Sequence, residues 1–152
     1  NNYAGSNTSI FDSTDRELFI TGVQLEVGET ATPFEHEDYG TTLAKCQRYY
    51  NKSYAYATAV GTASTYTGSF LGTRGSGIFN CNIIFPTSMR TAPTVTIYSP
   101  ATGTSGKCRN VQTNGDENSA GFQISEDKAG FNGVTSTVGH GLQAHYVAEA
   151  EL

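Results

Sequence analysis

The chain has 152 residues, of which 15% are charged and 37% are hydrophobic, and its formal net charge is −5. This length suits one domain with an appended segment, and low charge with abundant Tyr, Thr and Gly is typical of β-rich extracellular or virion proteins. The acidic balance without a Lys/Arg cluster argues against nucleic-acid binding. No stretch approaches the ~20 apolar residues of a membrane span.

Residues 1–38 are predicted to be the terminal strand and linker of an upstream module. The sequence starts with Asn1 rather than methionine and shows no signal-peptide pattern, so we expect it to be a piece of a longer protein. Leu18–Val27 alternates between a continuously apolar side and a side that turns polar, which predicts a half-buried strand. Gly28 and Pro33 end this strand, because proline lacks the N–H of a continuing ladder.

Residues 39–53 are predicted to form a short amphipathic helix. Asp38 immediately precedes them, and its carboxylate can accept from the free N–H groups of the first turn. Leu43, Cys46 and Tyr50 are spaced i, i+3 and i+7, so they share one stripe of the helix. A helix this short is unstable alone in water, so the stripe must dock on something. We predict that these three residues form an oligomer interface.

Residues 54–152 are predicted to form an antiparallel, jelly-roll-like β-sandwich, which makes the chain mainly β. Asn114-Gly115 is a strong hairpin signal. The last segment alternates almost without error, and we expect its apolar side to be the inner face and His145 to lie on its polar face. The expected strands are residues 65–71, 78–85, 94–99, 109–113, 120–125, 128–134 and 142–152.

The sequence contains no recognisable catalytic motif, and we expect neither an enzyme, a metal site nor another cofactor. The three cysteines share no metal-ligand spacing. Cys46 and Cys81 are predicted to be buried, whereas Cys108 lies in a polar loop and is predicted to be exposed; one disulfide among them is left open. His140 and His145 fall on opposite sides of the last strand, which disfavours a shared metal.

One long stretch carries a family resemblance. Residues 21–50, TGVQLEVGETATPFEHEDYGTTLAKCQRYY, combine a G-x-QLE-x-G strand with ATPFE and LA-x-CQRYY. This junction resembles one in many bacteriophage tail-fibre and related virion appendage proteins, where it follows a carbohydrate-binding-like jelly roll and precedes a C-terminal β domain. FPTSMRTAPTVTIYS and the closing YVAEAEL also resemble that domain.

The resemblance implies a virion location in a tail fibre or other external appendage, with further virion proteins as partners. It also implies a homotrimer, for which the apolar surface of the helix supplies a physical motive. Host-surface glycan is the expected ligand, since tyrosines offer flat faces to sugars and polar side chains offer hydrogen bonds. The candidate contacts are Tyr54, Tyr56, Tyr66, Arg74, Tyr98 and Asn114.

Two alternatives remain open at this point. The domain could be purely architectural, capping or decorating the virion without a ligand. It could also belong to a sugar-cleaving tailspike enzyme, in which acidic residues such as Asp116 and Glu126 pair across a cleft. In solvent-rich turns, such residues more often serve as solvated charges.

Overall fold

The structure, a computed structural model, describes residues 20, 23–30, 32–33, 36–73, 79–133 and 137–151. The chain divides into two compact units, residues 1–37 and 38–152. In the first unit, residues 23–27 of the predicted strand Leu18–Val27 form no strand and are exposed. A strand needs a neighbour to accept its hydrogen bonds, and no described segment pairs with these residues. The rest of this prediction, apart from Ile20, lies outside the described residues.

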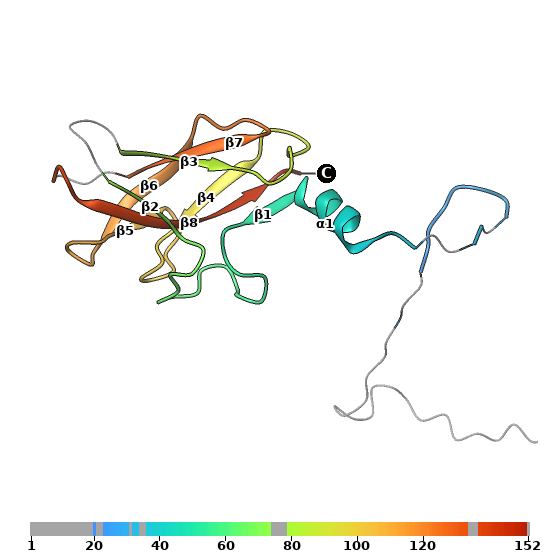
Figure 1. The fold of residues 1–152 in the computed structure, drawn as a ribbon, viewed down its shortest axis with the longest axis horizontal. Helices are drawn as coiled ribbons and strands as arrows, with labels where there is room; N and C mark the ends of the chain where they lie inside the picture. Colours follow the sequence, from blue (N-terminus) through green and yellow to red (C-terminus); the bar gives the residue numbers. More distant parts are fainter. Residues whose placement is uncertain are drawn as a thin grey trace, which may run out of the picture. The chain divides into compact units, whose positions relative to one another are not determined.

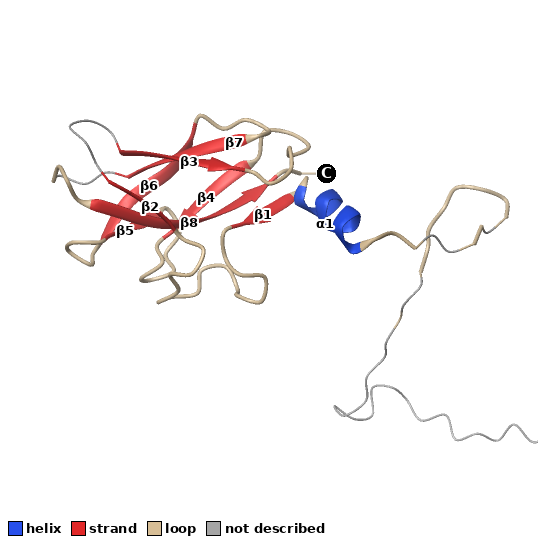
Figure 2. Cartoon of the chain, viewed as in Figure 1, coloured by secondary structure: helices blue, strands red, loops and turns tan. Residues whose placement is uncertain are grey.

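The second unit begins with the helix α1 (Tyr39–Gln47), and its start is the predicted one. The Asp38 carboxylate accepts from the Thr41 backbone N–H at 3.0 Å, which caps the first turn. The helix is shorter than the predicted 39–53, because β1 (Tyr50–Lys52) follows almost at once and pairs with the last strand. Figures 1 and 2 show this short helix next to an otherwise β structure.

Seven more strands follow, and every described pair is antiparallel. They are β2 (Phe70–Thr73), β3 (Phe79–Ile84), β4 (Thr94–Tyr98), β5 (Lys107–Asn110), β6 (Asp116–Phe122), β7 (Lys128–Gly133) and β8 (Gly141–Glu149). The main path runs β1-β8-β5-β6-β7-β3, and β2 and β4 also pair with β8. Since β2 contacts β3, the sheet curls over on itself. The predicted mainly β, antiparallel, sandwich-like class is confirmed.

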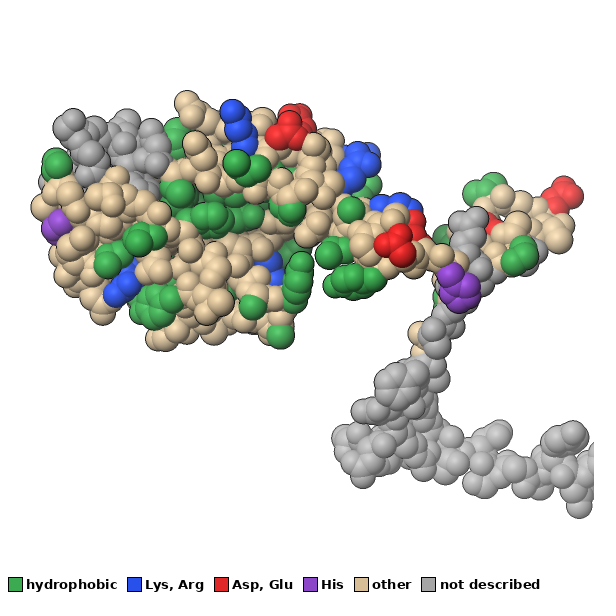
Figure 3. Space-filling view, in the orientation of Figure 1, with side chains coloured by type: hydrophobic (Ala, Val, Ile, Leu, Met, Phe, Trp, Pro, Cys, Tyr) green, Lys and Arg blue, Asp and Glu red, His purple; other side chains and the backbone are tan. Residues whose placement is uncertain are grey.

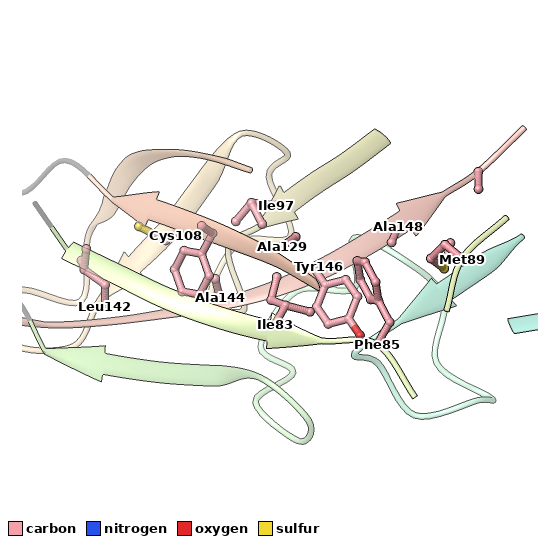
Figure 4. Close-up of a cluster of buried hydrophobic side chains, with 12 residues drawn as sticks. Ile83, Phe85, Met89, Ile97, Cys108, Ala129, Leu142, Ala144, Tyr146 and Ala148 are labelled. Atoms are coloured by element: carbon pink, nitrogen blue, oxygen red, sulfur yellow. The ribbon is translucent and has the colours of Figure 1, made fainter. Parts of the chain in front are cut away.

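The strand β8 organises both the sheet and the core. Its first half lies between β2 and β5, and its second half lies between β1 and β4. The predicted inward side of β8 is buried, and Figure 4 shows its side chains among those of β3, β4, β5 and β7. The β7 backbone approaches closely, because a Cβ on Gly133 would lie 2.3 Å from Leu142 Cδ1. The buried β8 residues on this side are Leu142, Ala144, Tyr146 and Ala148.

The cysteines correct three sequence predictions. Cys108 was expected to be exposed, but it points into the core from β5, where burial raises the pKa of its thiol to about 11. The surrounding polar, Gly-containing sequence hid the alternation that turns Lys107 and Arg109 outward and Cys108 inward. Cys46 was expected to be buried and is exposed, while Cys81 is only half-buried. All three thiols are free.

The polar side of β8 is also covered, and His145 is fully buried on it. Segment 53–69 lies across this side, and the Tyr54 ring stacks on the fully buried His145 ring at 3.9 Å between centroids. The Thr65 carbonyl lies 2.9 Å from His145 Nε2, so that nitrogen must donate. The Nδ1 atom of the neutral ring then accepts from Ser53 Oγ at 2.8 Å. His145 therefore holds both ends of the segment against the sheet.

Candidate functional site

An open groove, the α1 groove, lies between α1 and the sheet and has a cavity volume of about 510 Å³. Figure 3 shows apolar side chains on both sides of this hollow. It is lined by α1, by β1 and the turn after it, by Pro86 after β3, and by Tyr146 of β8. The lining residues are Leu43, Cys46, Gln47, Tyr50, Asn51, Lys52, Tyr54, Ala55, Tyr56, Pro86 and Tyr146.

The groove brings together residues that the sequence assigned to two different roles. All three predicted interface residues line it, along with the predicted ligand residues Tyr54 and Tyr56. Tyr50 is 41% exposed and Tyr56 is 75% exposed, so both offer aromatic surface to a partner. Tyr54 is only 3% exposed, because most of its ring packs on His145.

The C-terminal end of α1 is fixed to the sheet, whereas its sides are not. The Arg90 backbone N–H donates to the Arg48 carbonyl at 2.8 Å, and the Ala150 N–H donates to the Tyr49 carbonyl at 2.8 Å. No residue of α1 itself is buried. Two backbone hydrogen bonds therefore set the direction of the helix, while Leu43 stays only half-buried and Cys46 is exposed.

The polar groups of the groove are largely engaged with one another. Lys52 Nζ donates to the carbonyls of Tyr56 and Thr58 at 3.2 and 2.7 Å, which holds the turn after β1. Tyr146 Oη donates to Asn51 Oδ1 at 2.5 Å, and burial raises the pKa of Tyr146 to about 12. The buried Tyr146 phenol stays neutral, and the Lys52 ammonium is occupied by the two carbonyl groups. The groove therefore suits apolar and aromatic side chains.

A second surface, the Arg109 cluster, gathers Tyr66, Arg109, Asn114 and Gln143. Arg109 Nε donates to Asn114 Oδ1 at 2.7 Å, and its Nη1 donates to Gln143 Oε1 at 3.0 Å. The guanidinium carbon lies 5.0 Å from the centroid of the Tyr66 ring, a cation–π contact. Tyr66 is 43% exposed and Asn114 is exposed, so the cluster is open to solvent.

The sequence found only half of this cluster. Tyr66 and Asn114 were predicted as ligand contacts, and Asn114 sits in the predicted β5–β6 hairpin with a positive φ of 58°. Arg109 and Gln143 were missed, because they become neighbours only through the pairing of β5 with β8, in which they lie directly opposite each other. Alternation along each strand shows which residues point outward, but it does not fix the register between strands.

Two further predicted contacts lie elsewhere. Tyr98 on β4 is half-buried and meets the Tyr54 ring edge-on, with 6.4 Å between centroids. Arg74 lies outside the described residues. The structure therefore separates the six predicted ligand residues into a groove pair, a cluster pair, one packed tyrosine and one residue without a described position.

Of the two acidic residues considered for sugar cleavage, Asp116 is held by hydroxyl groups. Asp116 accepts from Ser99 Oγ and from Thr102 Oγ1, each at 2.5 Å, and Asp127 accepts from Ser88. Within the described ranges, no three His, Cys, Asp or Glu side chains are grouped so that they could hold a metal ion. None of the helices in the described part of the chain has the length and apolar character needed to cross a membrane.

No protein-family model matches this sequence, and comparisons with curated proteins and with solved structures give no match. Function must therefore be inferred from the α1 groove and the Arg109 cluster.

Proposed function

We propose that the chain is part of a bacteriophage tail fibre or related virion appendage, in which residues 38–152 form a homotrimer through the α1 groove and contribute to recognition of host-surface glycans. The resemblance of residues 21–50 to phage fibre junctions supplies the biological setting. The short length of α1 and its lack of buried residues supply the physical reason for association.

The observation that carries the proposal is that α1 has only nine residues, none of them buried. An isolated helix shorter than about 12–15 residues is marginal in water, and most helical stability in proteins comes from packing of an apolar face. Here the face opens onto a groove flanked by exposed tyrosines, residues that are enriched at protein interfaces. A second copy that covers the groove would stabilise the helix and remove this apolar surface from water.

The charge distribution also favours association of the second unit. Residues 38–152 contain eight Lys/Arg and seven Asp/Glu, a net charge of +1, whereas residues 1–37 contain one Arg and seven Asp/Glu, a net charge of −6. Electrostatic repulsion between copies of the β domain is therefore weak, because net charge near zero promotes association.

Light scattering on the full chain tests the association. We expect a mass near three times 16.2 kDa, and we expect Leu43→Asp to reduce it to the mass of one chain, because a buried charge is costly in an apolar contact. Thr42→Asp is the matched control: it adds the same charge to the adjacent, exposed helix position, outside the groove lining. A monomeric unsubstituted chain, or equal masses for the two variants, would contradict the proposal.

Saccharide binding by the same samples separates the remaining alternatives. A purely architectural domain predicts the trimer without saccharide binding. A sugar-cleaving enzyme predicts released oligosaccharide that Asp116→Asn or Glu126→Gln abolishes. The proposed function predicts that the chain binds saccharide and leaves it intact.

A further inference from the structure

The Arg109 cluster contains a guanidinium that is held rigidly but is not neutralised. Its two described hydrogen bonds go to the neutral side-chain amides of Asn114 and Gln143. Arginine has five N–H donors, so three, including both on Nη2, have no partner among the described residues. The charge of Arg109 therefore remains available to an anion.

The nearby acidic groups do not neutralise this charge within the described part of the chain. Asp116 lies opposite Arg109 in the β5–β6 pair, but its carboxylate accepts from Ser99 and Thr102. The Glu117 carboxylate accepts from Asn110 Nδ2 at 3.2 Å. Both carboxylates are thus engaged on other groups, and Arg109 is left with amide acceptors and an aromatic ring.

The remaining members of the cluster are fixed in place. Gln143 uses both ends of its amide, since Oε1 accepts from Arg109 and Nε2 donates to Ser69 Oγ at 2.7 Å. Ser69 Oγ in turn donates to the Tyr66 carbonyl at 2.5 Å, so Gln143 positions both the cation and the aromatic residue. A site that is ordered before binding loses less conformational entropy when its ligand arrives.

We propose that the Arg109 cluster binds a saccharide that carries a carboxylate, such as a uronic acid residue. This inference rests on the proposed glycan recognition and names its ligand class. The planar guanidinium matches the geometry of a carboxylate. The exposed Tyr66 ring packs against the sugar, and Asn114 Nδ2 donates to a sugar hydroxyl.

Isothermal titration calorimetry of the full chain with tri-galacturonate and with its methyl ester tests this inference. The two probes share one sugar backbone and differ in the charge of the carboxyl groups. We expect the ester to bind at least about tenfold more weakly, because a hydrogen bond between charged groups is worth roughly 1.5–3 kcal/mol and each 1.4 kcal/mol is a factor of ten. Arg109→Gln should weaken binding of the acid to a similar extent.

Lys107→Gln is the matched control, because it removes one positive charge two residues away on the same strand. Lys107 Nζ donates to Asn118 Oδ1 at 2.7 Å, a bond that glutamine can also make. This variant should bind tri-galacturonate within about twofold of the unsubstituted chain, as expected for loss of a surface charge outside the site. Circular dichroism of both variants checks that the fold is retained.

Three outcomes would overturn the inference: equal binding of acid and ester, equal weakening by the two substitutions, or no binding of the acid. If neutral oligosaccharides bind while tri-galacturonate does not, the ligand class is wrong and the proposed glycan recognition stands. Conversely, Arg109-dependent binding by a monomeric chain supports the site and contradicts the proposed trimer.

Discussion

The two ends of segment 53–69 meet the same side of β8, but a tyrosine at one end is buried and a tyrosine at the other is exposed. Tyr54 stacks on His145 and is 3% exposed, whereas Tyr66 lies over Arg109 and is 43% exposed. An imidazole can be buried as a neutral ring, so the stacked pair of Tyr54 and His145 can be packed away from water. A guanidinium keeps its charge, and burying it without a carboxylate would be costly. The partner beneath each tyrosine therefore determines whether the ring serves packing or stays accessible to a ligand.

The first and largest test of this contrast compares Tyr54→Ala with Tyr66→Ala. Removing a buried aromatic ring costs about 3–5 kcal/mol, since the cavity over His145 cannot fully collapse. The Tyr66 variant should lose less than about 1 kcal/mol, because surface substitutions have small effects. Urea unfolding followed by far-UV circular dichroism measures both. Similar losses for the two variants would mean that the two ends of the segment are energetically alike.

The second test uses the protonation of His145. Burial lowers the pKa of His145 from 6.5, and the hydrogen bond to the Thr65 carbonyl only partly opposes this shift. The unfolded chain therefore binds a proton at pH values where the folded chain does not. Stability from this group is complete above about pH 6.5 and falls on acidification, by up to ~1.4 kcal/mol per pH unit until the folded pKa is reached.

His145→Phe should remove this pH dependence. Phenylalanine keeps the stacking with Tyr54 but loses both ring hydrogen bonds, so we expect a loss of ~1–3 kcal/mol at neutral pH. Urea midpoints measured from about pH 7.5 to about pH 5 should fall in the unsubstituted chain and stay flatter in the variant. His140→Gln is the control and should keep the slope. A variant that retains the full slope would assign it to another group.

Local patterns predicted the parts of the fold that depend on neighbouring residues. Asp38 was identified as an N-cap from its position before the helix, and Asn114-Gly115 as a hairpin from its dipeptide. The alternation of residues 142–150 gave the core side of β8. Each of these features follows from backbone geometry within a few residues, so the sequence carries it directly.

Several missed features depend on contacts between distant segments. The sequence gives no reason for segment 53–69 to cover the polar side of β8, so the burial of His145 was not predicted. Likewise, Arg109 meets Gln143 only because β5 and β8 pair in one register. The predicted stripe placed Tyr50 on the helix, but α1 ends at Gln47 and Tyr50 begins β1. Cys46 was expected to be buried, yet no other part of the described chain covers it.

The third test compares an exposed thiol with a buried thiol. Cys46 is exposed in the α1 groove, whereas Cys108 is buried and has a pKa of about 11. Because the thiolate is the reactive form, Ellman's reagent should modify Cys46 rapidly and should reach Cys108 only after unfolding. Cys46→Ala identifies the fast phase by removing it.

The same reaction reports whether copies of the chain cover the groove. If they do, the fast rate should fall several-fold as protein concentration rises, because Cys46 then lies within an interface. Leu43→Asp should react at one rate at all concentrations, and Thr42→Asp should follow the unsubstituted chain. A fast rate that is independent of concentration in the unsubstituted chain would mean that any association uses another surface. The apolar stripe of α1 would then remain open to a partner of different sequence.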